Sequence, residues 1–195
     1  MSTSINQTQT NLKKYWGYSQ DISQKSSQLL HLNLVLNSLT HSLTNIIQGN
    51  TMLEPYHKDK DGTLKKFDFI VSNPPFKTDF SDYRDDLDNK KNTDRFFAGI
   101  PKIPLKQKDK MTIYLIFIQH IIYSLSNNGV AAIVVPTGFI TAQTGIEYKI
   151  REEIIKRNLL SGLISMPSNI FAATPTSVSI LFLKKNSESG KVFLI

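Results

Sequence analysis

Cysteine is absent from this 195-residue sequence, which excludes both a disulfide framework and thiolate metal sites. The absence fits the reducing environment of the cytoplasm, so we expect a cytoplasmic protein. Histidine is scarce, and its four positions show no metal-ligand spacing: His31, His41, His57 and His120. We therefore expect no metal site.

Long apolar runs are missing as well. The most apolar stretch, residues 111–125, contains Gln119 and His120 and is shorter than the roughly 20 apolar residues of a membrane-spanning helix. It predicts a buried helix, and we expect no membrane partner. Residues 1–7 are polar and do not have the pattern of a secretory signal peptide.

Negative charge is comparatively scarce, because 16 acidic residues stand against 23 lysines and arginines and leave a net charge of +7. An excess of positive charge suits a polyanion such as nucleic acid. The basic residues are spread through the chain, at positions that include 13–14, 65–66, 90–91 and 102–110. A solvated surface is therefore the alternative interpretation.

One short segment concentrates possible chemistry. The apolar run 67–71 is followed, after one serine, by Asn73-Pro74-Pro75-Phe76. Two prolines end a strand abruptly, so the Asn73 side chain and fixed carbonyls project from the strand end, where open parallel sheets bind ligands. An amide oxygen, a carbonyl and an aromatic ring suit the exocyclic amino group of a planar base. The alternative is a simple turn with Phe76 in the core.

The rest of the chain alternates between strand and helix patterns. Strands are expected over 15–20, 43–48, 67–71, 130–135, 160–166, 178–183 and 192–195, and helices over 23–39, 111–125 and 145–157. Asn127-Asn128-Gly129 is a signal for the end of the second helix. Residues 77–110 are polar and lack periodicity, which fits a functional loop or a disordered one. The alternation predicts an α/β fold with a mostly parallel sheet.

From about Tyr15 to its last residue, the chain resembles the catalytic core of the modification (methylase) subunit of type I restriction–modification systems, an N6-adenine DNA methyltransferase family. The similar blocks, in order, are 67–76, 94–101, 114–125, 129–138, 149–156, 167–171 and 177–185. The resemblance implies a partial S-adenosylmethionine-dependent, Rossmann-like sheet, mostly parallel with a C-terminal antiparallel hairpin. It divides the chain into a polar N-terminal tail, 1–14, and an incomplete catalytic domain, 15–195.

The resemblance also implies roles for the residues at the end of the 67–71 strand. Asn73 and the Pro74 carbonyl would accept hydrogen bonds from the target N6 amino group and hold it in line with the sulfonium, with Pro75 stiffening the corner. Phe76 would stack on the flipped adenine, and Phe171 would offer a second aromatic ring to it. For Phe171, a place in the core is the alternative.

Two further residues would bind the cofactor in such a protein. Asp21 would accept hydrogen bonds from the ribose hydroxyls, although it could instead cap the helix that begins near Ser23. Asn50 stands where the family usually has an aspartate that accepts from the cofactor's adenine amino group. A turn asparagine after a strand is the alternative for Asn50.

The glycine-rich turn that cradles the methionine end of S-adenosylmethionine should precede Asp21, but Gly17 is the only glycine there. We therefore expect impaired cofactor binding and a chain truncated at both ends, with the family's first strand missing. That strand would lie between those at 15–20 and 67–71, so its loss would leave two ladder edges unpaired.

The resemblance implies DNA, a specificity subunit and a restriction subunit as partners. Lysines of the polar segment would touch phosphates, or would simply be solvated: Lys102, Lys106, Lys108 and Lys110. Three hypotheses follow. The chain is the core of an adenine-N6 DNA methyltransferase, or a related protein-glutamine or RNA methyltransferase, or a non-catalytic remnant that only binds partner subunits. The second group more often has tyrosine in place of Phe76.

Overall fold

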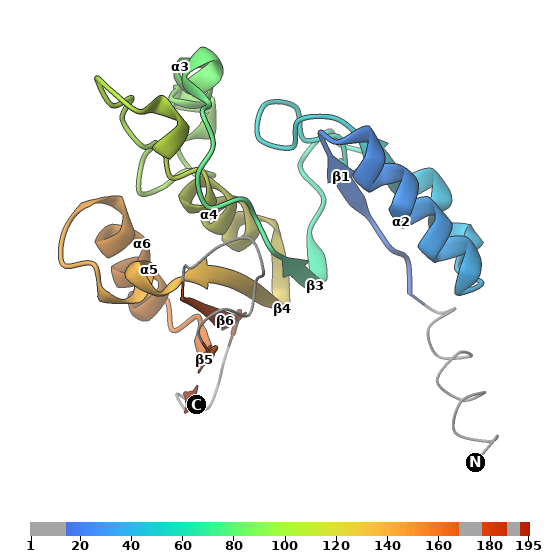
Figure 1. Cartoon of the computed structure of the whole chain (residues 1–195). Helices are drawn as coiled ribbons and strands as arrows, with labels where there is room; N and C mark the ends of the chain where they lie inside the picture. Colours follow the sequence, from blue (N-terminus) through green and yellow to red (C-terminus); the bar gives the residue numbers. More distant parts are fainter. Residues whose placement is uncertain (1–14, 168–176, 187–191) are drawn as a thin grey trace. The chain divides into compact units, whose positions relative to one another are not determined.

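The computed structural model describes residues 15–167, 177–186 and 192–195 (Figure 1). The chain divides into two compact units, Met1–Lys65 and Lys66–Ile195. This division falls inside the predicted domain 15–195, and the predicted tail 1–14 lies outside the described residues.

The first unit contains a two-stranded parallel sheet in which Ser19 lies opposite Ile46 and Asp21 lies opposite Gln48. Its elements in chain order are β1 (Ser19–Asp21), α2 (Gln24–Leu36), the 3-10 helix η1 (Thr40–Asn45) and β2 (Ile46–Gln48). The strand expected over 15–20 is shorter and lies later in the chain. The strand expected over 43–48 is wrong over its first half, where η1 forms. Ser42 is buried in η1, and its Oγ accepts a hydrogen bond from the Gly17 N–H at 2.9 Å.

Helix α2 is confirmed as a helix, and it leaves its leucines accessible to solvent. Leu29, Leu32 and Leu36 are 53%, 54% and 71% exposed. Ser38 has a φ of 58°, in the left-handed region, which ends the helix before Leu39. The apolar residues of α2 therefore contribute little to a core.

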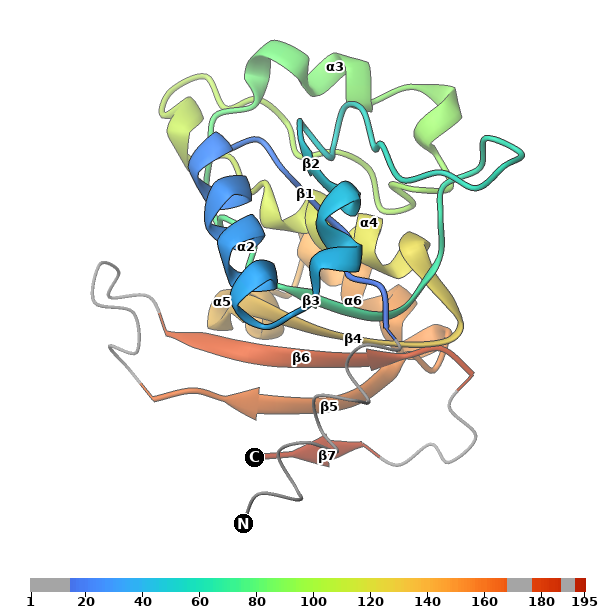
Figure 2. The same cartoon turned by 90° about the vertical axis from the view of Figure 1, so that its right-hand side faces the viewer.

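The second unit contains a five-stranded mixed sheet, in the order β3-β4-β6-β5-β7 (Figure 2). Its strands are β3 (Phe67–Ser72), β4 (Leu125–Pro136), β5 (Leu160–Ser165), β6 (Val178–Lys184) and β7 (Phe193–Leu194). β3 runs parallel to β4 and β5 runs parallel to β7, whereas β6 is antiparallel to both of its neighbours. The predicted α/β fold and the antiparallel hairpin near the C-terminal end are confirmed, and the sheet is mixed, because two of its strand pairs are parallel and two are antiparallel.

Helices α4 (Tyr114–Ser124) and α6 (Gly145–Lys156) supply the apolar side chains that pack on β4 and β6. Along β4, alternate residues are buried in this core, and Ile133 is fully buried. The expected helix 111–125 is thus confirmed as a buried helix. None of the helices within the described ranges is long and apolar enough to cross a membrane.

The end of α4 differs from the prediction. Asn127-Asn128-Gly129 does not cap the helix, because β4 begins at Leu125 and these residues lie in an irregular part of that strand. A Cβ on Gly129 would lie 2.7 Å from the Phe67 carbonyl oxygen, so the close approach of β3 requires glycine at this position.

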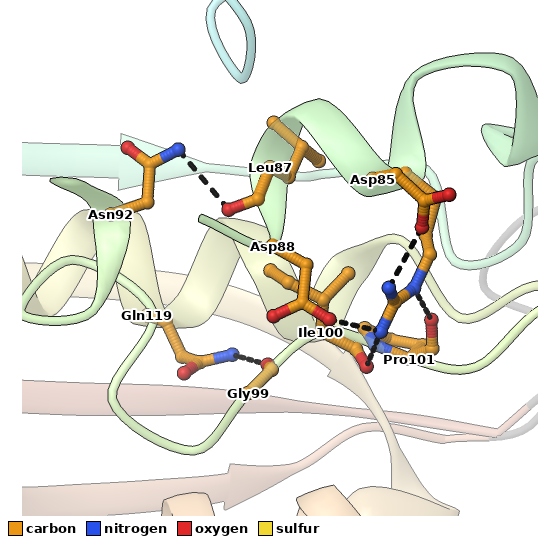
Figure 3. A network of polar contacts seen from close by, with 9 residues as sticks. Asp85, Leu87, Asp88, Asn92, Gly99, Ile100, Pro101 and Gln119 are labelled. Carbon is orange, nitrogen blue, oxygen red and sulfur yellow. Dashed lines mark hydrogen bonds and ion pairs between the residues drawn. The ribbon is translucent and has the colours of Figure 1, made fainter. Parts of the chain in front are cut away.

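The polar segment 77–110 is ordered. It contains η2 (Ser81–Tyr83), α3 (Arg84–Leu87), η3 (Lys90–Asn92) and η4 (Lys108–Lys110). Arg84 forms ion pairs with Asp85 and Asp88 and donates hydrogen bonds to the carbonyls of Ile100 and Pro101 (Figure 3). The fully buried Gln119 of α4 donates to the Gly99 carbonyl at 3.0 Å and accepts from the Ala98 N–H at 2.7 Å. Tertiary contacts therefore hold a segment that has no periodic pattern.

Candidate functional site

The segment Asn73-Pro74-Pro75-Phe76 directly follows β3, as the sequence predicts. Ser72, the last residue of β3, lies opposite Ile133 of the parallel strand β4, so both strands end at the same edge of the sheet. Asn73 and Pro75 are exposed there, Pro74 is buried and Phe76 is half-buried. The Asn73 amide is therefore accessible to solvent, and the buried Pro74 that follows it holds the corner in place.

Phe76 belongs to a row of three aromatic rings. Its ring centroid lies 6.2 Å from that of Tyr114 at an interplanar angle of 76°, and Tyr114 lies 6.2 Å from Phe139 at 86°. Tyr114 and Phe139 are buried, and such edge-to-face contacts are favourable. Core packing therefore orients Phe76 while part of the residue stays accessible, so the core and base-stacking interpretations are compatible.

Tyr114 is a neutral phenol at this site. Burial raises the pKa of its hydroxyl, and the negative charge of Glu147 raises that pKa further. A phenol with a raised pKa is a poor general base near neutral pH. Tyr114 can therefore position Phe76 but does not supply a base.

Arg151 of α6 fixes the chain that follows β4. Its guanidinium donates hydrogen bonds to the carbonyls of Phe139, at 2.9 Å, and of Ile140 and Ala142. These carbonyls lie at the end of the short helix α5 (Thr137–Thr141). Sequence reasoning missed both Tyr114 and Arg151, because they lie within helical patterns that carry no local functional motif.

The predicted cofactor residue Asp21 lies in the first unit, at the end of β1. Its Oδ1 accepts a hydrogen bond from the Ser23 N–H at 2.7 Å, and its carbonyl accepts from the Gly49 N–H at 2.9 Å. Ser23, rather than Asp21, is the N-cap of α2, since its Oγ accepts from the Ser26 N–H. The helix-capping alternative for Asp21 is therefore wrong in detail, although one of its carboxylate oxygens does stabilise the turn before the helix.

Asn50 follows β2 at the same edge of the two-stranded sheet as Asp21. Its Oδ1 accepts hydrogen bonds from the N–H groups of Met52 at 3.0 Å and Leu53 at 3.3 Å. This is the geometry of a turn asparagine, and it engages the acceptor that the cofactor's amino group would need. The cofactor role of Asn50 stays a prediction that requires its side chain to turn.

The lysine-bearing segment begins and ends beside the Asn73 corner. The Thr78 N–H donates to the Met111 carbonyl at 3.0 Å, so the two ends of the segment lie side by side. The four predicted phosphate-binding lysines are exposed: Lys102, Lys106, Lys108 and Lys110. Phe171 lies outside the described residues. In the described part of the chain, no His, Asp and Glu residues gather in a group that could hold a metal ion.

The whole chain, residues 1–195, matches the family model described as N-6 DNA Methylase. The type I restriction enzyme MpnII methylase subunit of Mycoplasma pneumoniae is 29% identical over 187 residues, which cover 94% of this chain and 33% of that protein. The chain spans about a third of the length of the type I methylase subunits it matches.

Two solved structures share the fold. The methyltransferase subunit of a type I restriction–modification system from Streptococcus thermophilus matches with a TM-score of 0.70 and 24% identity, over 91% of this chain and 36% of that one. A Listeria monocytogenes protein assigned to the class I S-adenosylmethionine-dependent methyltransferases matches with a TM-score of 0.61 and 16% identity, over 99% of this chain and 53% of that one.

Proposed function

We propose, since this chain belongs to the N-6 DNA methylase family, that it forms part of the catalytic core of a type I restriction–modification methylase subunit. The reaction is the transfer of a methyl group from S-adenosylmethionine to N6 of an adenine flipped out of DNA. The observation that supports this most is the accessible Asn73 amide at the carboxyl edge of β3, beside a Phe76 ring that buried aromatic residues orient.

The Asn73 corner can hold the target amine by its two N–H groups. In the proposed reaction one N–H donates to Asn73 Oδ1 and the other to the Pro74 carbonyl oxygen. Both bonds turn the nitrogen lone pair toward the methyl group and become stronger as positive charge develops on nitrogen. Phe76 stacks on the base and fixes its plane.

When bound, S-adenosylmethionine supplies an electrophilic methyl group on a sulfonium. Asn73 Oδ1 and the Pro74 carbonyl would hold the two N–H groups of the positively charged methylated amine until one proton passes to solvent. This chemistry needs no strong base, which agrees with the neutral Tyr114. Positioning and acceptor placement are the contributions of Asn73, Pro74 and Phe76.

The carboxylate of Asp21 fits the cofactor's ribose, because only one of its oxygens is engaged by Ser23 and a diol can donate to the other. Asn50 fits less well in its present rotamer, because Oδ1 serves its own turn. We also propose that a chain without the glycine-rich turn binds S-adenosylmethionine weakly.

DNA, a specificity subunit and a restriction subunit are the proposed partners. The exposed lysines of the segment 77–110 lie on a loop whose ends flank the Asn73 corner, where the phosphates of a flipped nucleotide's strand would pass. Sequence specificity would then come from a separate subunit, and this chain would supply contacts that do not depend on sequence.

The test is a chimera in which this chain replaces the matching part of the Mycoplasma pneumoniae methylase subunit, assembled with that system's specificity subunit. Asn73→Ala should lower adenine-N6 methylation, measured by mass spectrometry of digested DNA, by about 100-fold, since one preorganised partner is worth about 2–4 kcal/mol. Asn127→Ala removes an exposed amide at the other edge of the sheet and is the matched control. Near-normal methylation by the Asn73→Ala chimera would refute the proposed catalytic role.

An inactive parent chimera that still binds the specificity subunit would instead support the non-catalytic alternative.

A further inference from the structure

One loop of the second unit exposes apolar and basic side chains together. It consists of residues 102–110 and lies between Pro101 and Met111, which are both buried. Leu105 is fully exposed, and Ile103 is 39% exposed. The loop also carries four lysines and one aspartate, and all five are exposed. Since Leu105 contributes nothing to the core, its apolar side chain is available to a partner.

The protein restricts the shape of this loop. At its start, the Pro101 carbonyl accepts a hydrogen bond from Arg84 Nε at 3.2 Å (Figure 3). Near its end, Gln107 has a φ of 61°, in the left-handed region that residues other than glycine rarely adopt. The Gln107 carbonyl accepts a hydrogen bond from the Lys110 N–H at 2.9 Å. These contacts limit the positions that the tip of the loop can take.

The 102–110 loop ends beside the segment that carries Asn73. The Met111 carbonyl, directly after the loop, accepts a hydrogen bond from the Thr78 N–H at 3.0 Å, and Thr78 closely follows the Asn73 corner in the chain. Leu105 precedes Met111 by six residues, so its Cα lies within roughly 20 Å of that anchor. A duplex whose adenine reaches Asn73 can therefore lie within reach of Leu105.

The charge of the loop favours a polyanion over an apolar protein surface. Exposed lysines flank Leu105 on both sides: Lys102, Lys106, Lys108 and Lys110. The core of a protein–protein interface is depleted of lysine, because burying an ammonium group costs free energy. On DNA the lysines can stay hydrated beside the phosphates while an apolar side chain between them reaches the bases.

We infer that Leu105 enters the base stack of bound DNA and fills the space that the target adenine leaves when it flips out. Proteins that kink a duplex insert leucine and other apolar side chains between base steps. The vacated layer is about 3.4 Å thick, the spacing of bases along one strand, and suits a single aliphatic side chain. Leu105 is buried only when the adenine is out, so it favours the flipped state. The inference rests on the proposed function, because it assumes that an adenine is flipped.

Fluorescence anisotropy of labelled duplexes, titrated with the full 195-residue chain, tests the inference. One duplex is intact, and the other has the same sequence with an abasic site at its centre. The parent should bind the abasic duplex about ten-fold more tightly, because no base has to be unstacked before Leu105 enters. Leu105→Ala should lose most of this preference and bind the intact duplex with little change in affinity.

Two further variants separate insertion from a general contact with DNA. Lys106→Met removes one phosphate contact and should weaken the binding of both duplexes by the same factor. Ile155→Ala is the matched control and should change neither affinity, because Ile155 is a 61% exposed apolar residue of α6, outside the loop. A parent without a preference for the abasic duplex, or an equal preference in the parent and Leu105→Ala, would overturn the inference.

Methylation by the chimeric subunit distinguishes this inference from the proposed function. Leu105→Ala should lower the methylation of a paired target adenine about ten-fold and that of a mispaired one much less, because a mispaired base costs less free energy to unstack. Asn73→Ala should lower both alike, because Asn73 acts after flipping. Equal losses on the two substrates for Leu105→Ala would contradict insertion and leave the role of Asn73 intact. Near-normal methylation by Asn73→Ala would refute the proposed function, and the abasic duplex, which has no target base, would still test Leu105.

A protein partner for Leu105 would give a different result. Assembly of the chimera with the specificity subunit can be measured by analytical ultracentrifugation. If Leu105→Ala weakens that assembly and leaves the preference for the abasic duplex unchanged, Leu105 belongs to a protein interface and the inference is wrong.

Discussion

His120 should make the second unit sensitive to mild acid. The residue lies in α4, and its Nδ1 accepts a hydrogen bond from Arg95 Nε at 2.9 Å. Burial and, to a smaller extent, the positive charges of Arg95 and Lys66 together lower the pKa of His120 from 6.5 to about 3. The folded chain therefore holds a neutral imidazole at pH values where the unfolded chain would protonate it.

The sign and size of the effect follow from proton linkage. Because the folded pKa lies below the unfolded one, the unfolded chain binds more protons between about pH 6.5 and pH 3. The contribution of neutral His120 to the stability of the folded chain is fully present above pH 6.5, and it is lost as the pH is lowered. At pH 5, which is 1.5 pH units below the unfolded pKa, the loss of unfolding free energy is about 2 kcal/mol. This loss does not depend on the exact value of the folded pKa.

Urea unfolding followed by circular dichroism at pH 7 and pH 5 measures this loss. His120→Asn keeps an acceptor for Arg95 but cannot titrate, and the protonation of carboxylates affects both proteins alike. The loss of unfolding free energy between pH 7 and pH 5 should be about 2 kcal/mol larger in the parent than in the variant. Equal losses in the two proteins would show that His120 does not cause this loss.

Three further predictions concern the candidate site and the two units. In the chimeric methylase, Phe76→Ala should lower methylation by roughly 5- to 150-fold, the range expected for one stacked base, and Phe76→Tyr should retain most of the activity. Equal activity of Phe76→Ala and the parent would contradict base stacking. Calorimetric titration of the 195-residue chain with S-adenosylmethionine should give weak binding or none, and micromolar affinity would contradict the role given to the glycine-rich turn. Hydrogen exchange should be slower over 67–135 than over 15–50, because the leucines of α2 are exposed, and uniform strong protection of both ranges would refute this.

The sequence predicted the edge that carries Asn73 because the relevant information is local. A short apolar strand ended by two prolines can hardly continue, and parallel neighbours end at the same edge. The buried helix α4 and strand β4 were predicted for a similar reason, since each is marked by a local concentration of apolar residues. The roles proposed for Asn73 and the residues after it come from the family resemblance, because composition and spacing do not specify them.

Other parts of the fold depend on contacts that no sequence period records. Segment 77–110 is held by Arg84 and Gln119, whose partners lie 16 to 21 residues away along the chain. The helix α4 ends within one residue of its predicted end, but Gly129 does not cap it, and Lys66 and Lys185 provide donors for the carbonyls there. At Asn50 the turn interpretation describes the observed geometry, and the cofactor role awaits a test.

The hydrogen bond between Thr78 and Met111 holds the two ends of the intervening segment together. The geometry of the sheet therefore does not depend on the length of that segment. Since both ends of the segment are anchored next to each other, residues can be added or removed between them without moving β3 or α4. Doubling the length of a flexible loop costs only about 0.6 kcal/mol in closure entropy. The exposed surface of this segment can therefore change during evolution with little loss of stability, while the Asn73 corner keeps its position.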